Sequence, residues 1–380
     1  MTDAIYIAFM AFMDFEGLKT TPPVPILLGV LKDLDGQLHL DQIIVNESLA
    51  GAAARRGARH ASLEAAVEGL LEHDCPIVGW SFFDRDVIRR SAVPAHLEKV
   101  FEARYVNALQ VSRAWRARLY PGFTIARESR FDPRHTLDKY AALAGYPHVD
   151  KLRGGKPTTW IRRVQAALKR TGKYRSLTKN VQKDWRALLD YNAHDLKALR
   201  AIWSKASCEL GKWREYEKAR YCVDQDRGRT ICVKAGASSA KLDALLVRHG
   251  AMRWAFITAW NPASLQLTRD ENARRQADLL ASLSAGGYQA LTGRGIGADT
   301  SWRPEESLLV LDISTRKARQ LGRQFGQFAI VTGSTGAQAR LVSCAVPVRN
   351  QACVAAKLAT ALVSESKVSN TLSRPQIAIT

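Results

Sequence analysis

Residues 7–20 read IAFMAFMDFEGLKT, an apolar run that closes on two acids, Asp14 and Glu16. A helix that spans a bilayer needs roughly 20 apolar residues, more than this run contains. A signal peptide carries basic residues before its apolar core, whereas this run has Asp3 before it and the two acids directly after it. We therefore expect a buried strand over 5–15.

The two acids at the end of this strand share one face of it. Alternate side chains of a strand point the same way, so the Cα atoms of Asp14 and Glu16 should lie roughly 6.6 Å apart. Two anions in such a place repel each other unless a cation lies between them. A strand end that emerges into solvent would explain either acid alone. The pair by itself thus leaves both a metal site and a solvated strand end open.

The segments that follow have the patterns of a mixed α/β domain. Two turn signals, TTPPVP and KDLDGQ, separate β-rich runs, and strands then alternate with helical periodicities. This order predicts a mixed sheet flanked by helices in a domain over 1–207. Further strands are expected at 26–31, 38–45, 76–80 and 105–108, and helices at 62–73, from about 84, and at 136–143, 158–170 and 177–207.

A third acid stands in the segment VGWSFFDRD. Asp84 follows a short buried strand and opens a helix, a position where residues often meet ligands. An Asp at a helix start can equally serve as an N-cap. Asp86, two residues later, could take either role. The sequence leaves the choice between Asp84 and Asp86 open.

The long helix expected near the end of this domain carries a fourth acid on its apolar face. Leu188, Tyr191 and Asp195 recur at spacings of three and four residues and form one stripe. A buried carboxylate without a partner is costly, and a metal ion would provide that partner for Asp195. Tyr191 lies one turn earlier on the same side. Asp190 and His194 point away from this stripe, and we expect them at the surface.

These acids together favour metal chemistry. Hard oxygen ligands suit Mg²⁺ or Mn²⁺. Two such ions roughly 3.5–4 Å apart can activate a water molecule and stabilise the leaving oxygen when a phosphodiester is cleaved. The acids would then close the first strand because a pair of metal ions binds there.

The order and spacing of the motifs resemble the DEDD exonucleases of the ribonuclease H-like superfamily, in the branch with a catalytic tyrosine. Over residues 5–205, FMDFEG is similar to the D-x-E motif of the first strand, VGWSFFD to the second acidic motif and YNAHD to the third, Y-x-x-x-D. TLDKYAALAGYP resembles the helix between the second and third motifs. The chain departs from the pattern at Trp80, Ser81 and Phe82, where many relatives have an Asn.

The resemblance implies a ribonuclease H-like mixed sheet and a 3′–5′ exonuclease that uses two Mg²⁺ or Mn²⁺ ions. It further implies that Tyr191 positions or deprotonates the attacking water. The metal ligands that it implies are Asp14, Glu16, Asp84 and Asp195.

The charge of the chain favours nucleic acid as the partner, rather than a membrane. The formal net charge is +20, and residues 151–186 hold twelve Lys and Arg against one acid, Asp184. Trp185 and two other aromatics are interleaved among them. One interpretation is a surface that tracks phosphates and stacks bases, and the other is a solvated helical face. The candidate nucleic-acid contacts are Arg162, Arg163, Lys169, Arg170, Lys173, Arg175, Trp160 and Tyr174.

The remainder of the chain reads as a second unit. Residues 208–250 look like a charged connector, 251–345 like a smaller α+β accessory domain, and 346–380 like a poorly ordered tail. Residues 252–335 resemble a small bacterial domain family of unknown function, DUF3293, through ITAWNP, ENARRQADLL and WRPEESLLVLDI. The segment GRGIG lacks the Lys-Ser/Thr pair of a phosphate-binding loop, and we interpret it as a turn. The sequence leaves open whether Glu305 and Glu306 are functional or belong to a simple loop.

The cysteines predict a reducing compartment. None of the six forms a C-x-x-C pair, which argues against a zinc ribbon or a disulfide scaffold. Without an export signal, a cytoplasmic protein is expected. The function that the sequence favours is a metal-dependent 3′–5′ exonuclease. The alternatives are a non-catalytic nucleic-acid-binding protein with a nuclease fold, or a protein whose main activity lies in its C-terminal unit.

Overall fold

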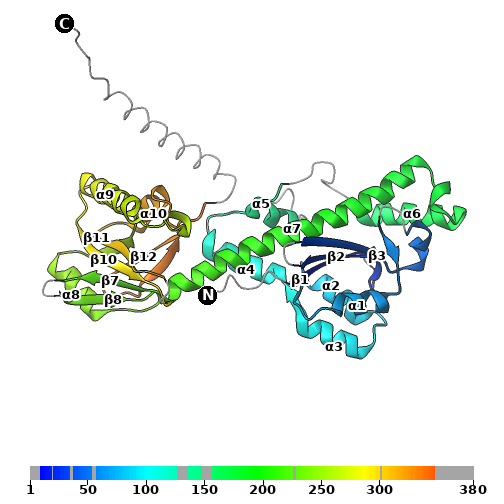
Figure 1. The fold of residues 1–380 in the computed structure, drawn as a ribbon, viewed down its shortest axis with the longest axis horizontal. Coiled ribbons are helices and arrows are strands. Elements are labelled where there is room, and N and C mark those ends of the chain that lie inside the picture. Colours follow the sequence, from blue (N-terminus) through cyan, green and yellow to red (C-terminus); the bar gives the residue numbers. More distant parts are fainter. Residues whose placement is uncertain are drawn as a thin grey trace, which may run out of the picture.

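The computed structural model describes residues 9–18, 20–34, 37–53, 57–125, 135–147, 156–225, 228–299 and 302–346. These residues form two mixed α/β units, each with its own sheet, and one long helix runs from the first to the second (Figure 1). Residues 347–380 of the tail expected over 346–380, and the first residues of the strand expected at 5–15, lie outside the described residues.

The first sheet has six strands in the order β4-β3-β2-β1-β5-β6. Strand β2 runs antiparallel to both β1 and β3, whereas β5 runs parallel to β1 and β6 parallel to β5. The expected strands are therefore present, in a mixed sheet. Their bounds are β1 Phe9–Leu18, β2 Val24–Leu34, β3 Gln37–Ile44, β4 Arg59–His60, β5 Ile77–Gly79 and β6 Tyr105–Asn107.

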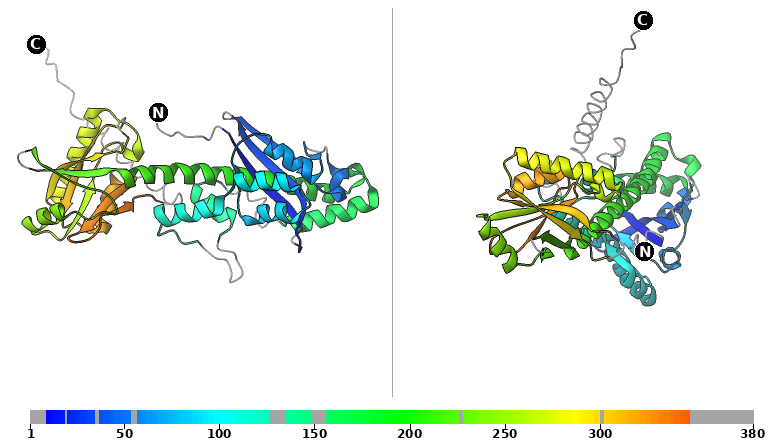
Figure 2. Two further views of the ribbon diagram at one scale, coloured as in Figure 1. Left: turned by 90° about the horizontal axis from the view of Figure 1, so that it is seen from below. Right: turned by 60° about the vertical axis from the view of Figure 1, so that its left-hand side comes forward.

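Helices cover both faces of this sheet (Figure 2). On one face Ala11, Met13 and Phe15 of β1 pack against α1, α2 and α3. On the other face Met10 and Phe12 pack against α7. The elements between β3 and the second sheet are η1 Glu47–Ala52, α1 Leu63–Leu71, α2 Phe82–Arg90, α3 Ala95–Arg104, α4 Ala108–Leu119, α5 Leu137–Ala144, α6 Pro157–Thr171, η3 Tyr174–Ser176 and α7 Lys179–Lys218.

This alternation decides where the acids of β1 point. Because every second side chain shares a face, Asp14 and Glu16 continue the row of Met10 and Phe12 toward α7. The other row, which packs on α1 to α3, is apolar throughout. The acids therefore lie between the sheet and the long helix.

Helix α7 is longer than expected. It was predicted over 177–207 but continues to Lys218, 40 residues in all. Its start is capped by Thr178, whose hydroxyl accepts the N–H of Val181 at 3.5 Å. Near its C-terminal end Trp213 is buried in a cluster that includes residues of the second sheet, and the ring of Tyr216 lies 5.7 Å from that of Phe328. One helix thus packs against both sheets.

The second sheet has seven strands in the order β13-β12-β9-β11-β10-β7-β8. Helices α9 and α10 cover one face and α8 the other (Figure 1). The bounds are β7 Arg220–Asp224, β8 Thr230–Val233, α8 Ala240–Arg248, β9 Arg253–Ile257, η5 Pro262–Ser264, α9 Arg269–Ala285, β10 Ala290–Ile296, β11 Glu305–Leu311, α10 Thr315–Gln324, β12 Ala329–Ser334 and β13 Arg340–Ser343.

Two expectations about this unit were wrong. Residues 208–250 are not an irregular connector, because the end of α7, β7, β8 and α8 occupy most of them. Val223, Ile231 and Val233 bury their side chains beside Leu246, so this segment belongs to the core of the second unit. GRGIG is not a turn either, since its first four residues lie in β10 and pair with both β7 and β11.

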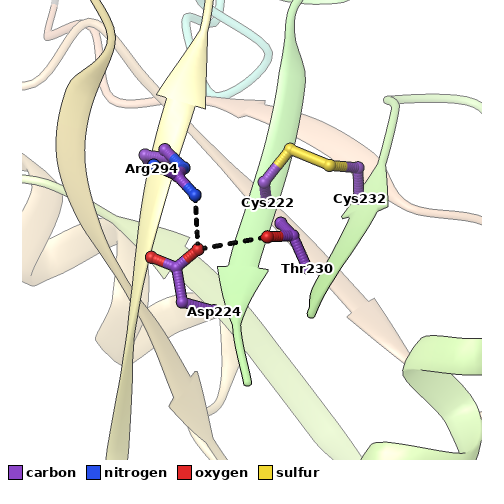
Figure 3. Close-up of a disulfide and its surroundings, with 5 residues drawn as sticks. All are labelled: Cys222, Asp224, Thr230, Cys232 and Arg294. Atoms are coloured by element: carbon purple, nitrogen blue, oxygen red, sulfur yellow. Dashed lines mark hydrogen bonds and ion pairs between the residues drawn. A yellow bond between two sulfur atoms is a disulfide. The ribbon is translucent and has the colours of Figure 1, made fainter. Parts of the chain in front are cut away.

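A disulfide joins β7 and β8, contrary to expectation (Figure 3). Cys222 and Cys232 lie directly opposite each other in the antiparallel pair, and their sulfur atoms are 2.03 Å apart. The two cysteines are ten positions apart, so no short motif marks the pair. Next to it, Asp224 accepts hydrogen bonds from Arg294 at 2.8 Å and from Thr230 at 3.4 Å.

Within the part of the chain that the structure describes, no helix combines the length and apolar character needed to cross a membrane.

Candidate metal centre

Three carboxylates from two distant segments meet between β1 and α7. Asp14 and Glu16 of β1 and Asp195 of α7 each offer an oxygen, and the three oxygens lie within 4.8 Å of one another. All three side chains are half-buried. Strand alternation places Asp14 and Glu16 on the same face of β1, as the sequence predicted. Helical periodicity places Asp195 on the side of α7 that faces them.

Asp84 adjoins this group. It lies in the first turn of α2, directly after β5, and is only 3% exposed. Its Oδ1 accepts the backbone N–H of Phe15 at 3.1 Å, so the carboxylate reaches β1 between the two acids. The N-cap of α2 is Ser81, whose hydroxyl accepts the N–H of Phe83. Asp84 is therefore not the N-cap residue, although its carboxylate also interacts with the backbone N–H of Ser81.

Asp86, the other candidate, is placed differently. It lies at the surface and forms ion pairs with Arg85 at 3.8 Å and with Arg90 at 4.0 Å. Its neighbours are cations rather than the other acids. The geometry thus brings Asp84, and not Asp86, to the acids of β1.

Burial raises the pKa values of these carboxylates. It raises the pKa of Asp14 to about 6, against the opposing effect of a hydrogen bond from Asn192. Burial and the nearby Asp14 raise the pKa of Asp84 to about 8. The pKa of Asp195 is raised as well, by burial and then by Asp14 and Asp138. A divalent cation among these oxygens would offset both the desolvation and the mutual repulsion.

The donor set fits a hard divalent cation. Every ligand atom that Asp14, Glu16, Asp84 and Asp195 offer is a carboxylate oxygen, the type that Mg²⁺ and Mn²⁺ prefer. No cysteine belongs to the group among the described residues, so a soft-metal site is not favoured.

Tyr191 lies beside this group. Its hydroxyl hydrogen-bonds to Asp195, one turn later on α7. Its ring meets the edge of the Trp160 ring, with 6.1 Å between the centroids. Burial and the surrounding carboxylates, Asp195 and Glu16 foremost, raise the pKa of the phenol well above its ordinary value. Without a bound cation, Tyr191 is therefore a neutral hydrogen-bond donor.

Asn192, which the sequence analysis did not single out, holds Asp14 in place. Its Nδ2 donates to Asp14 Oδ2 at 2.9 Å and to the backbone oxygen of Asp14 at 3.2 Å. Gln42 of β3 donates in turn to Asn192 Oδ1 at 3.0 Å and to the oxygen of Leu189 at 2.9 Å. The amide of Asn192 is fully buried, so this chain of hydrogen bonds fixes its orientation.

Gly29 makes room for this amide. It lies opposite Asp14 in the register of β1 and β2. A Cβ atom at this position would come within 2.1 Å of Asn192 Oδ1. The close approach of α7 to β2 therefore requires glycine here.

His194 contradicts the expectation of a surface position. It is 7% exposed, and its ring lies 5.3 Å from that of Tyr146. A ring nitrogen of His194 and carboxylate oxygens of Asp138 and Asp195 lie within 4.8 Å of one another. Helix α5 packs against this side of α7, which the helical periodicity of α7 alone could not reveal. Asp190 is exposed, as predicted.

The basic segment lies on α6, η3 and the start of α7. Arg163 forms an ion pair with Asp184 at 3.4 Å. Trp160 and Tyr174 are half-buried against the core between α6 and α7, and Trp185 is fully buried, so none is a freely exposed stacking platform. Residues 151–155 lie outside the described residues. The exposed cations of the segment include Arg162, Arg163, Lys169, Arg170, Lys173 and Arg175.

In the second unit Glu305 is part of β11 rather than of a simple loop. Its Oε1 accepts hydrogen bonds from Asn261 Nδ2 at 2.7 Å and from Trp302 Nε1 at 3.1 Å. Burial raises the pKa of Glu305. The side chain thus ties the ITAWNP segment to the strand.

A family model described as a protein of unknown function (DUF3293) matches residues 257–330. This match supports the resemblance expected for the second unit, over nearly the same residues. No curated protein and no solved structure is significantly similar to the chain.

Proposed function

We propose that the first unit is a metal-dependent nuclease of the ribonuclease H-like type, most consistent with a 3′–5′ exonuclease of the DEDD tyrosine branch. The observation that carries this proposal is the convergence of Asp14, Glu16 and Asp195, with Asp84 beside them. These acids come from a strand, a strand–helix junction and a helix that lie far apart in the chain. The strand order and the antiparallel β2 support the ribonuclease H-like part of the proposal.

The four acids would hold two Mg²⁺ or Mn²⁺ ions, which supply an activated water and charge stabilisation for the leaving oxygen when bound. The protein groups around them have separate tasks. Asn192 orients the carboxylate of Asp14, and the N–H of Phe15 orients that of Asp84. Tyr191, held by Asp195, presents a hydroxyl that can position the attacking water.

Exposed cations adjoin the same site. Helix α6, which carries several of them, packs against α7 and β1, and its Trp160 contacts Tyr191. A polyanion bound along α6 would therefore lie beside the acids. The net charge of +20 supports nucleic acid as that polyanion.

The test is incubation of the full chain with 5′-end-labelled single- and double-stranded DNA and RNA, in Mg²⁺, Mn²⁺ or EDTA. We expect shortening from the 3′ end with either metal and none in EDTA. Asp14→Asn and Asp195→Asn should abolish cleavage and weaken Mn²⁺ binding in calorimetry. Asp190→Asn, an exposed acid on the same helix, should behave like the parent.

Binding without cleavage would favour the non-catalytic alternative. Cleavage that survives both substitutions would locate the activity elsewhere, with the second unit as the next candidate. Equal Mn²⁺ binding by the parent and both variants would contradict the metal assignment.

A further inference from the structure

A cavity of about 320 Å³ opens in the second unit, away from the acids of the first. It lies where β12 ends and β9 and β13 begin, beside the start of α10. The residues that line it include Arg253, Arg340, Thr315, Thr332, Ser334 and Gln338, and no acid is among them. This volume falls at the lower end of the range of roughly 300–1,000 Å³ that small-molecule sites occupy.

Two arginines reach the cavity from neighbouring strands. Arg340 of β13 pairs with Thr332 of β12, and Arg253 of β9 pairs with Ser334 of the same strand. Because cross-strand partners and alternate residues share a face, all four side chains lie on the side of the sheet that α10 covers. Among the described residues, neither guanidinium donates a hydrogen bond or forms an ion pair.

Asp312, an acid whose charge interacts with that of Arg253, is held by backbone groups. Asp312 accepts the backbone N–H groups of Met252 and Arg253, at 2.8 Å and 3.2 Å. These bonds, and then the charge of Arg253, lower the pKa of Asp312. Asp312 is not part of the cavity lining, and the charge of Arg253 affects its pKa less than the two backbone bonds do.

The N-terminus of α10 adds further donors. Ile313 and Thr315 line the cavity, and Ser314 caps the helix by accepting the N–H of Lys317 at 3.2 Å. The helix has ten residues. Its first-turn N–H groups and its dipole favour an anion at this end.

Thr332 supplies an independent indication. It is 2% exposed, and its hydroxyl has no hydrogen-bond partner among the described residues. Buried hydroxyl groups rarely remain unpaired. Thr332 lines the same cavity as the two arginines, so a ligand there would supply the missing acceptor.

We propose that this cavity binds a phosphate group. Arg253 and Arg340 clamp it from two strands, the start of α10 donates N–H groups, and Thr332 contributes its hydroxyl. The phosphate can be inorganic, part of a nucleotide, or part of a nucleic-acid backbone, which share this chemistry. The site lies outside the metal centre, and the proposal does not depend on the nuclease activity.

The test is calorimetric titration of the full chain in EDTA, in chloride buffer, with inorganic phosphate, with 5′-AMP and with a short single-stranded oligonucleotide. The ligand whose dissociation constant differs most between the parent and the variants identifies the source of the phosphate. Arg253→Gln and Arg340→Gln should each bind that ligand about 10- to 100-fold more weakly, since each removes a charge-assisted contact. Thr332→Val should weaken binding by a smaller factor.

The matched control is Arg248→Gln. Arg248 is an exposed arginine on α8, which covers the opposite face of the sheet. Its loss should leave the affinity unchanged, and far-ultraviolet circular dichroism should confirm that every variant is folded. Arg340→Lys should recover only part of the affinity, because lysine lacks the planar fork. If the parent binds none of the three ligands, or if both arginine variants bind as the parent does, the proposal is wrong.

Discussion

The side-chain amide of Asn192 donates to the carboxylate of Asp14 at 2.9 Å and also to the backbone oxygen of the same residue at 3.2 Å. One residue of α7 thus holds both the side chain and the main chain of the first acid of the site. Gln42 fixes that amide from a third element, β3. The geometry of the candidate metal centre therefore depends on Asn192, a buried polar residue next to Tyr191.

Asn192→Ala should weaken metal binding without removing a ligand. Loss of an outer-shell partner typically costs about 10- to 100-fold in metal affinity. It should also lower the free energy of unfolding by about 1–3 kcal/mol. The buried Gln42 amide loses its bond to Asn192 and keeps only the one to the oxygen of Leu189. Titration with Mn²⁺ and urea unfolding measure the two effects. Asn180→Ala, an exposed asparagine of the same helix, is the control and should change neither.

Tyr191→Phe should slow single-turnover cleavage by about 10²–10⁴, with little change in substrate affinity. The substitution removes the hydroxyl that bonds to Asp195 but keeps the ring that meets Trp160. Rapid-quench measurement of cleavage at saturating enzyme tests this. A variant that cleaves as fast as the parent would contradict the role assigned to Tyr191.

His194 was expected at the surface but cannot act as a neutral control for that experiment. It is buried and close to Asp138 and Asp195, so His194→Ala should lower both stability and cleavage. Asp190→Asn takes its place as the neutral variant. Full activity of His194→Ala would show that its imidazole contributes nothing to the site.

The stability of the metal-free protein should fall as the pH rises. The folded-state pKa values of Asp14, about 6, and Asp84, about 8, lie above the ordinary value of 3.8. The folded protein therefore holds protons that the unfolded chain releases, so this stability is present below about pH 4 and is lost as the pH rises to about 8. Urea unfolding in EDTA across this pH range measures how the free energy of unfolding changes with pH.

Asp84→Asn should flatten that slope, because it removes the group with the higher pKa. Mn²⁺ affinity of the parent should rise over the same pH range, with release of protons, since the ligands must be deprotonated. A parent whose stability in EDTA is constant or increases between pH 4 and 8 would contradict the assigned pKa shifts.

The affinity for single-stranded nucleic acid should decrease steeply with salt if α6 tracks the backbone. Each phosphate contact contributes about 0.7 to the slope of log K against log salt concentration. Arg163 is already paired with Asp184, so replacing Arg162, Arg163, Lys169 and Arg170 by Gln should reduce the slope by about 2. Fluorescence anisotropy at several salt concentrations measures it.

A charge-matched control comes from four exposed basic residues of the second unit. Replacement by Gln should leave the slope nearly unchanged if α6 is the principal contact. If the slope falls equally in both quadruple variants, the basic segment is better interpreted as a solvated helical face. The control positions are Lys241, Arg248, Arg269 and Arg274.

The parts of the site that follow local periodicity could be predicted from the sequence. Strand alternation placed Asp14 beside Glu16, and helical spacing placed Asp195 on the buried side of α7. Choosing Asp84 over Asp86 required the bond to Phe15, which joins residues 69 positions apart. A hydrogen bond between residues so far apart in the chain cannot be predicted from the pattern of a single sequence.

Asn192 had a partial signal. It lies four residues after Leu188 and three before Asp195, the spacing of the buried stripe. Its partner Gln42 is 150 positions away in the chain. No pattern in the sequence connected Gln42 with the site. His194 was misplaced because α5, which covers it, comes from another part of the chain.

In the second unit, the sequence did not predict strands β7 and β8. Their alternating apolar residues are few, because the strands are short, and charged residues flank them. β7 pairs with both β8 and β10, so the expected connector is part of the sheet. The same pairing brought Cys222 and Cys232 together, which cysteine spacing alone did not reveal.

The length of α7 sets a minimum footprint for any ligand that touches both units. From Asp195, at the acids, to Tyr216, which packs on Phe328 of the second unit, the helix advances about 32 Å at about 1.5 Å per residue. A duplex rises about 3.4 Å per base pair. A nucleic acid shorter than about nine base pairs could therefore occupy the acids or the second unit but could not bridge them. If the first unit acts on nucleic acid as proposed, the length of α7 would distinguish ligands that reach only one unit from ligands long enough to reach both.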